Sequence, residues 1–103
     1  MKTAEMERLV MERVKRQDWS LNPREDLNSI VEELGELSRE VRRYETGRQR
    51  PDETEENKEL IIKEMASEIG DILFPLIKVA QYYGITLEQA FLAHHTKMEQ
   101  RYK

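Results

Sequence analysis

The sequence lacks cysteine, and this excludes disulfide bonds, thiolate nucleophiles and cysteine-based zinc sites. It also lacks a glycine-rich phosphate loop. Basic residues are not in excess, because 17 Lys and Arg stand against 21 Asp and Glu and give a net charge of −4. This balance argues against a nucleic-acid partner, which normally meets a basic surface. A phosphate ligand would therefore need a cation between itself and the protein.

Long apolar runs are missing as well. Residues 1–16 alternate charged with single or paired apolar residues, so we expect neither a signal peptide nor a membrane-spanning helix. The expectation is a soluble cytoplasmic protein with no membrane partner. At 103 residues, the chain is expected to form a single domain, 1–103, that buries only about two thirds of its unfolded surface. Oligomerisation would relieve this shortage of core.

Apolar residues recur at helical spacing in four segments, which predicts an all-α protein. We expect a four-helix bundle-like protomer with helices at roughly 3–18, 23–46, 54–83 and 86–102, assembling as an oligomer. Asn22 followed by Pro23 is typical of a helix start, and the run from Thr86 to Gln89 is typical of a capping box. Gly84 is expected to end the third helix, and the polar residues 48–56 to form an exposed loop.

Acidic pairs lie beside the apolar stripes of the second and third helices. Glu33 and Glu36 are three residues apart, as are Glu68 and Asp71, so each pair points to one side of its helix. The core face of the second helix is expected to consist of Leu27, Ile30, Val31, Leu34, Leu37 and Val41.

Four carboxylates converging between two helices would suit magnesium or manganese, which prefer oxygen ligands. The alternative is that these residues are solvated surface acids. Gly35 and Gly70 precede the second acid of each pair, although glycine inside a helix costs about 1 kcal/mol relative to alanine. Close helix approach or ligand access would explain both glycines, and their matching positions favour a site.

Together these motifs resemble a known family. The runs Glu32-Glu33-Leu34-Gly35-Glu36 and Glu68-Ile69-Gly70-Asp71 are similar to the EExxE and ExxD signature of the MazG-like nucleoside triphosphate pyrophosphohydrolases. That family belongs to the all-α NTP pyrophosphatase superfamily, which also contains the dimeric dUTPases. The resemblance extends from about Trp19 to Tyr102. It implies magnesium-dependent hydrolysis of a (deoxy)nucleoside triphosphate to a monophosphate and pyrophosphate, as nucleotide-pool house-cleaning by a homodimer or tetramer.

The resemblance also implies roles for individual residues. By motif position the metal ligands would be Glu33, Glu36, Glu68 and Asp71. Glu32 and Glu33 are the candidate catalytic residues. Glu32 would support a second ion or orient the attacking water, but its direction, away from Glu33, fits a surface role almost as well.

Substrate contacts are expected from four further residues. Lys97 and Arg101 would hold the phosphate tail, or else form a solvated basic face. Trp19 would stack on a base or pack at the helix junction, and Asn28 would hydrogen-bond a base or sugar.

Ser67, Pro75 and His94 depart from the pattern of the family and put the substrate identity in doubt. The alternative function is a non-catalytic helical protein-interaction or regulatory module with acidic faces. That reading accounts for the high charge content but leaves the paired motifs unexplained.

Overall fold

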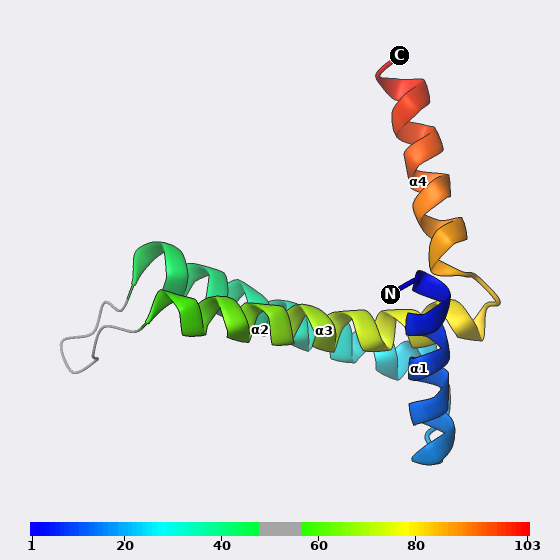
Figure 1. Cartoon of the computed structure of the whole chain (residues 1–103), viewed down its shortest axis with the longest axis horizontal. Coiled ribbons are helices and arrows are strands. Elements are labelled where there is room, and N and C mark those ends of the chain that lie inside the picture. The colour runs from blue at the N-terminus through cyan, green and yellow to red at the C-terminus, as the bar shows by residue number, and fades with distance from the viewer. Residues whose placement is uncertain (48–56) are drawn as a thin grey trace.

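The computed structural model describes residues 1–47 and 57–103, and these ranges form four α-helices and no strand. The helices are α1 (Thr3–Arg16), α2 (Pro23–Thr46), α3 (Lys58–Tyr82) and α4 (Leu87–Arg101). The two long helices, α2 and α3, lie side by side and run antiparallel, while α1 and α4 project in opposite directions from one end of this pair (Figure 1). The all-α, bundle-like prediction is confirmed.

Side-chain caps fix the beginnings of three helices. Asn22 Oδ1 accepts a hydrogen bond from the backbone N–H of Glu25 at 3.2 Å, which confirms the predicted start of α2. Asn57 caps α3, so this helix begins at Lys58; the predicted start at residue 54 and the predicted loop 48–56 lie outside the described residues. Thr86 opens α4 through the predicted capping box.

The predicted helix ends are also informative. Gly84 has a φ of +69°, as expected for a glycine that terminates α3. Helix α1 ends at Arg16 instead of residue 18, because Asp18 takes a φ of +54° and turns the chain. Helix α3 continues through Pro75 without a break in its helical assignment.

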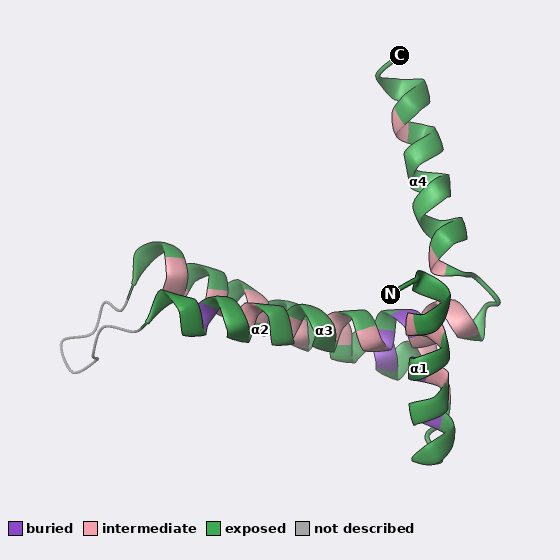
Figure 2. Cartoon of the chain, in the orientation of Figure 1, coloured by how far each residue is buried: buried purple, intermediate pink, exposed green. Residues whose placement is uncertain are grey.

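The hydrophobic core is small and lies where α1 crosses α3. Val10, Val14 and Ile77 form the buried cluster, and buried positions concentrate near α1 in Figure 2. Partly buried Met6, Leu21, Phe74 and Leu87 pack against it. The radius of gyration is 17.2 Å, against about 13 Å for a compact chain of this length. A single chain is thus extended, with little interior.

The predicted core face of α2 is only half correct. Ile30 and Leu37 are half-buried against α3, but Val31 is 69% exposed and Leu34 is 55% exposed. Leu27 and Val41 are exposed too. The reason is geometric: α3 covers the face that carries Ile30 and Leu37, and the other four residues are rotated from Ile30 by about 20° to 100°, all to the same side.

Helix α4 makes contacts chiefly with α1, and every residue on it except Leu87 and Met98 is exposed. Phe91, for example, is 67% exposed. None of the described helices combines the length and apolar character needed to cross a membrane.

Candidate metal centre

Three of the predicted carboxylates converge on one side of the α2–α3 pair. Glu33 and Glu36 lie one turn apart on α2, and Glu68 faces them from α3. Each contributes one carboxylate oxygen, and these oxygens all lie within 4.8 Å of one another. Glu33 and Glu68 are half-buried, whereas Glu36 is exposed. The cluster is thus anchored between the helices and open on one side.

The electrostatics of this cluster favour a bound cation. A hydrogen bond with Glu33, followed by partial burial and the negative charges of Glu36, Glu33 and Asp71, raises the pKa of Glu68 to about 7. Among the described residues, neither Glu33 Oε2 nor Glu68 Oε2 has a hydrogen-bond partner, although both atoms are buried. A divalent ion with a preference for oxygen donors fits such a set of ligands.

Asp71 lies next to the cluster of three carboxylates but is not part of it. It follows Glu68 by three residues on α3, and its negative charge acts on Glu68. It is not among the three carboxylates that meet within 4.8 Å, but with Glu33 it lines the adjoining cavity.

Neighbouring acids further along the pair are already neutralised by a cation. Arg43 Nη1 donates to Glu64 Oε2 at 2.9 Å and also hydrogen-bonds Glu40. The hydrogen bond from Arg43 holds the pKa of Glu64 below its usual value. Glu40 and Glu64 therefore belong to an ion-pair network beyond the cluster, and they differ in this way from Glu33 and Glu68.

The remaining predicted site residues are dispersed in the single chain. Glu32 and Asn28 are exposed on α2, and neither belongs to the carboxylate group. Lys97 and Arg101 are exposed on the outer half of α4, which extends away from the α2–α3 pair (Figure 1). Trp19 is 49% exposed and contacts Phe74 edge to face, with ring centroids 6.2 Å apart.

A polar cavity of about 350 Å³ adjoins the carboxylate cluster, and two of the residues that line it were not among the predicted site residues, although helical spacing puts Lys78 on the same flank as Glu68 and Asp71. Asp26 and Lys78 form an ion pair there, with 3.0 Å between Asp26 Oδ1 and Lys78 Nζ. Asp26 precedes Glu33 by seven residues, and Lys78 follows Asp71 by seven. Because seven residues make about two helical turns, this spacing was the signal that could have found them. The full lining is Asp26, Ser29, Glu33, Asp71, Phe74, Pro75 and Lys78.

Close helix packing does not explain the two motif glycines. The space that a Cβ would fill at Gly35 or Gly70 has no neighbouring atom within 4 Å in the described part of the chain. The expectation that these glycines let α2 and α3 approach each other is therefore wrong for the single chain, because both face away from the opposite helix.

Comparison with known proteins places this geometry in a family. Residues 22–103 match the MazG nucleotide pyrophosphohydrolase domain, and this range contains the whole carboxylate cluster. The uncharacterized protein YvdC of Bacillus subtilis is 35% identical over 104 residues, which cover 100% of this chain and 98% of YvdC.

A second relative, YpjD of Bacillus subtilis, is 43% identical over 61 residues, or 59% of this chain and 50% of YpjD. The crystal structure of YpjD, a proposed pyrophosphatase, superposes with a TM-score of 0.73 at 30% identity and covers 94% of each chain. The family match, the relatives and the paired acidic motifs agree, and the chain belongs to the MazG nucleotide pyrophosphohydrolase family.

Proposed function

We propose that this protein hydrolyses (deoxy)nucleoside triphosphates to monophosphates and pyrophosphate, with magnesium as the required ion and manganese as a substitute. The observation that carries the proposal is the convergence of Glu33, Glu36 and Glu68 within 4.8 Å on two facing helices. Membership of a nucleotide pyrophosphohydrolase family supports the reaction class. In this role the enzyme would act on the soluble nucleotide pool of the cytoplasm.

Each carboxylate has a task in this proposal. Glu33 and Glu68, which are half-buried, would hold the ion from between the helices. Glu36 would hold it from the solvent side, and Asp71 from the side of the cavity that it lines with Glu33. The ion would neutralise phosphate charge and lower the pKa of the attacking water. Glu32, exposed one residue before Glu33, would orient that water from the solvent side.

The phosphate-binding role of Lys97 and Arg101 depends on assembly. Both lie on α4, which extends away from the α2–α3 pair of its own chain in Figure 1. They would therefore act on a triphosphate held by another subunit. Trp19 contacts Phe74, which lines the cavity, and this contact supports the proposal that Trp19 meets the nucleoside in its own chain.

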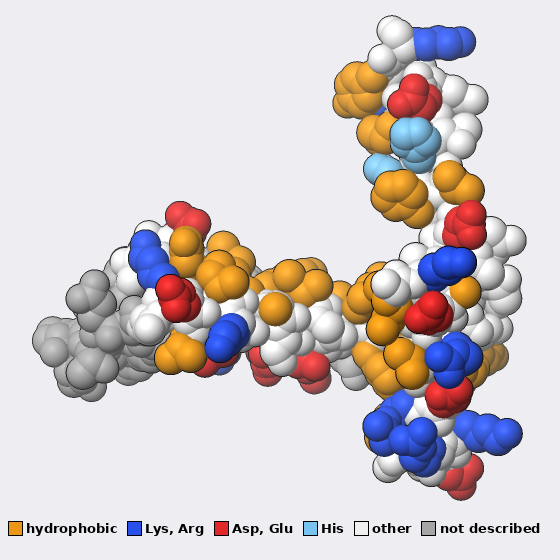
Figure 3. Space-filling view, in the orientation of Figure 1, with side chains coloured by type: hydrophobic (Ala, Val, Ile, Leu, Met, Phe, Trp, Pro, Cys, Tyr) orange, Lys and Arg blue, Asp and Glu red, His pale blue; other side chains and the backbone are white. Residues whose placement is uncertain are grey.

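Exposed apolar surface supports a homodimer or tetramer. Side chains of this kind gather along the upper edge of the α2–α3 pair in Figure 3, and acidic side chains show at its lower edge near the middle and also at its left end. The exposed apolar residues of α2 and α3 are Leu27, Val31, Leu34, Val41, Leu60, Ile62, Ile69, Leu73 and Leu76. An apolar strip of this length marks an interaction surface.

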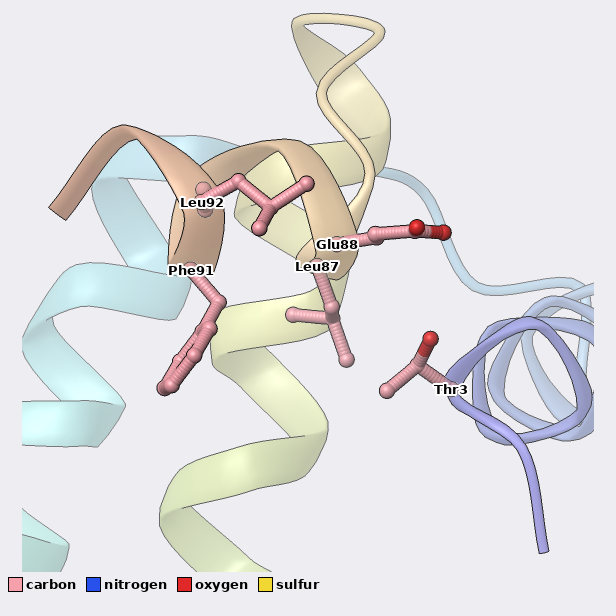
Figure 4. A pocket seen from close by; sticks show the side chains of 6 residues that line it. Thr3, Leu87, Glu88, Phe91 and Leu92 are labelled. Carbon is pink, nitrogen blue, oxygen red and sulfur yellow. The ribbon is translucent and has the colours of Figure 1, made fainter. Parts of the chain in front are cut away.

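Helix α4 also carries exposed apolar surface. A cavity of about 530 Å³ lies between the beginnings of α4 and α1, with Phe91 and Leu87 on one side and Thr3 on the other (Figure 4). Phe91 and Leu92 remain half or more exposed there. A second copy of the chain would cover both this surface and the apolar edge of α2–α3, and would supply the interior that one chain lacks.

The test of the function is a panel of nucleoside triphosphates incubated with magnesium, with pyrophosphate release as the measurement. Glu36→Gln and Asp71→Asn should each abolish turnover while helical content stays unchanged by circular dichroism. Glu45→Gln, which changes an exposed acid on α2, the helix of Glu36, is the matched control. Absence of pyrophosphate with every nucleotide, or full activity in both variants, would contradict the proposal and favour the non-catalytic interaction module.

A further inference from the structure

The ion pair between Asp26 and Lys78 is unusual because both partners are nearly buried. Asp26 is 7% exposed, and the Lys78 side chain is 12% exposed. Removing two charges from water is unfavourable and offsets most of their mutual attraction, so a buried pair contributes little net stability. Stability alone is therefore a weak explanation for placing this pair beside the metal centre.

Asp26 is also incompletely satisfied. Its Oδ1 atom contacts Lys78 Nζ, but its Oδ2 atom is buried and has no hydrogen-bond partner among the described residues. A buried acceptor without a donor destabilises the folded protein, and more so when the acceptor carries charge. Because Asp26 lines the polar cavity, a ligand that enters the cavity with an N–H or O–H donor would remove this cost.

The cavity adjoins the carboxylate cluster. Glu33 and Asp71 are among its lining residues, and Asp26 lies seven residues before Glu33, about 10 Å along α2. Phe74 forms an apolar wall, and Trp19 packs edge to face on that ring. Lys78 Nζ also lies 5.9 Å from the centroid of the Trp19 ring. A volume of about 350 Å³ is at the small end of ligand sites and fits one planar base with its sugar.

We infer that Asp26 and Lys78 are specificity-determining residues that read the base of the nucleotide, an inference that rests on the proposed function. Asp26 Oδ2 accepts a hydrogen bond from an N–H of the base, and Lys78 Nζ donates to a neighbouring ring nitrogen or carbonyl oxygen. A base suits the Asp26 end of the cavity better than a phosphate group, because a base offers N–H donors to Asp26, whereas a phosphate would bring further negative charge to a carboxylate that already has Lys78 as its partner.

The experiment compares ligands that share the triphosphate but differ in the nucleoside. For the best nucleotide of the panel, Asp26→Asn should raise KM at least tenfold and change kcat little, because the contact forms equally in the ground and transition states. The inhibition constants of inorganic tripolyphosphate and of ribose 5′-triphosphate should change less than twofold. Glu25→Gln, the exposed neighbouring acid, is the matched control and should leave all three constants unchanged.

Asn at position 26 leaves Lys78 without its carboxylate, so folding is checked by circular dichroism. If that variant unfolds, the double variant Asp26→Asn with Lys78→Met, which contains no unpaired charge, is measured in the same way. A rise in the inhibition constant of ribose 5′-triphosphate equal to the rise in KM would show that Asp26 contacts the sugar and would overturn the assignment to the base.

Two further results separate the inference from the proposed function. An unchanged KM in a folded, active Asp26→Asn protein would mean that the pair is only structural, and would overturn the inference while the proposed function stands. A wild-type protein inactive toward every nucleotide would overturn both.

Discussion

The carboxyl groups of Glu33 on α2 and Glu68 on α3 meet across the helix pair, and hydrogen bonding between them is the largest reason why the pKa of Glu68 rises to about 7. Two carboxyl groups can share a hydrogen bond only while one of them keeps a proton. At neutral pH the same oxygens can exchange that proton for a divalent ion. The metal-free and metal-bound proteins should therefore respond to pH in opposite directions.

The first prediction concerns the stability of the metal-free protein. Between pH 4.5, the ordinary pKa of the carboxyl, and about 7, the folded chain keeps a proton on Glu68 that the unfolded chain has lost. The free energy of unfolding should therefore fall as pH rises through this window. Thermal melts in chelator at pH 5.5 and pH 8 measure the effect. Glu68→Gln should flatten the difference, and an equally steep slope in that variant would contradict the assignment.

The second prediction concerns metal binding. Magnesium or manganese should raise the melting temperature of the wild-type protein, because an ion bound only by the folded state stabilises it by mass action. The shift should grow as pH rises through about 7, where the proton on Glu68 ceases to compete. Glu33→Gln should abolish most of the shift, and Glu45→Gln should preserve it. A shift retained in Glu33→Gln would remove that residue from the ligand set.

The third prediction concerns Gly70, which lies inside α3 with open space where a Cβ would lie. Gly70→Ala should stabilise the chain by about 0.5–1 kcal/mol, since alanine loses less backbone entropy in a helix. Urea unfolding measures the change. Gly84→Ala is the contrasting variant and should destabilise the protein, because its φ of +69° strains any side chain. A destabilised Gly70→Ala protein would show that another molecule packs on this face.

The fourth prediction concerns assembly. Val31 is 69% exposed on the apolar edge of α2, so Val31→Asp should alter the folded single chain by less than about 0.5 kcal/mol. In a dimer or tetramer the same change would bury an unpaired charge and dissociate the subunits. Light scattering after size exclusion gives the mass. Lys63→Asp, exposed on α3, is the control, and an unchanged mass for Val31→Asp would place the interface elsewhere.

The sequence was sufficient to predict those features of the structure that depend on neighbouring residues alone. Asn22 with Pro23 set the beginning of α2, and the box from Thr86 to Gln89 set that of α4, because capping depends only on residues within one turn. The spacing of Glu33, Glu36 and Glu68 on predicted helices likewise anticipated the cluster.

Contacts between helices were harder to predict from the sequence. Helical spacing could not tell which part of the apolar stripe α3 would cover, so Val31 and Leu34 were assigned to a core that the single chain does not form. The pairing of Asp26 with Lys78 was missed because it joins residues 52 positions apart, and neither belongs to a motif. Such contacts depend on helix register, which periodicity alone does not fix.

The α2–α3 pair carries its carboxylates and its exposed apolar residues on opposite edges. Under the proposed function, a subunit that docks on the apolar edge would leave the solvent side of the carboxylate cluster uncovered. Exchange of residues such as Val31 and Leu73 would then change the assembly and leave Glu33, Glu36 and Glu68 in place, so that only the contribution of Lys97 and Arg101 from another subunit would vary.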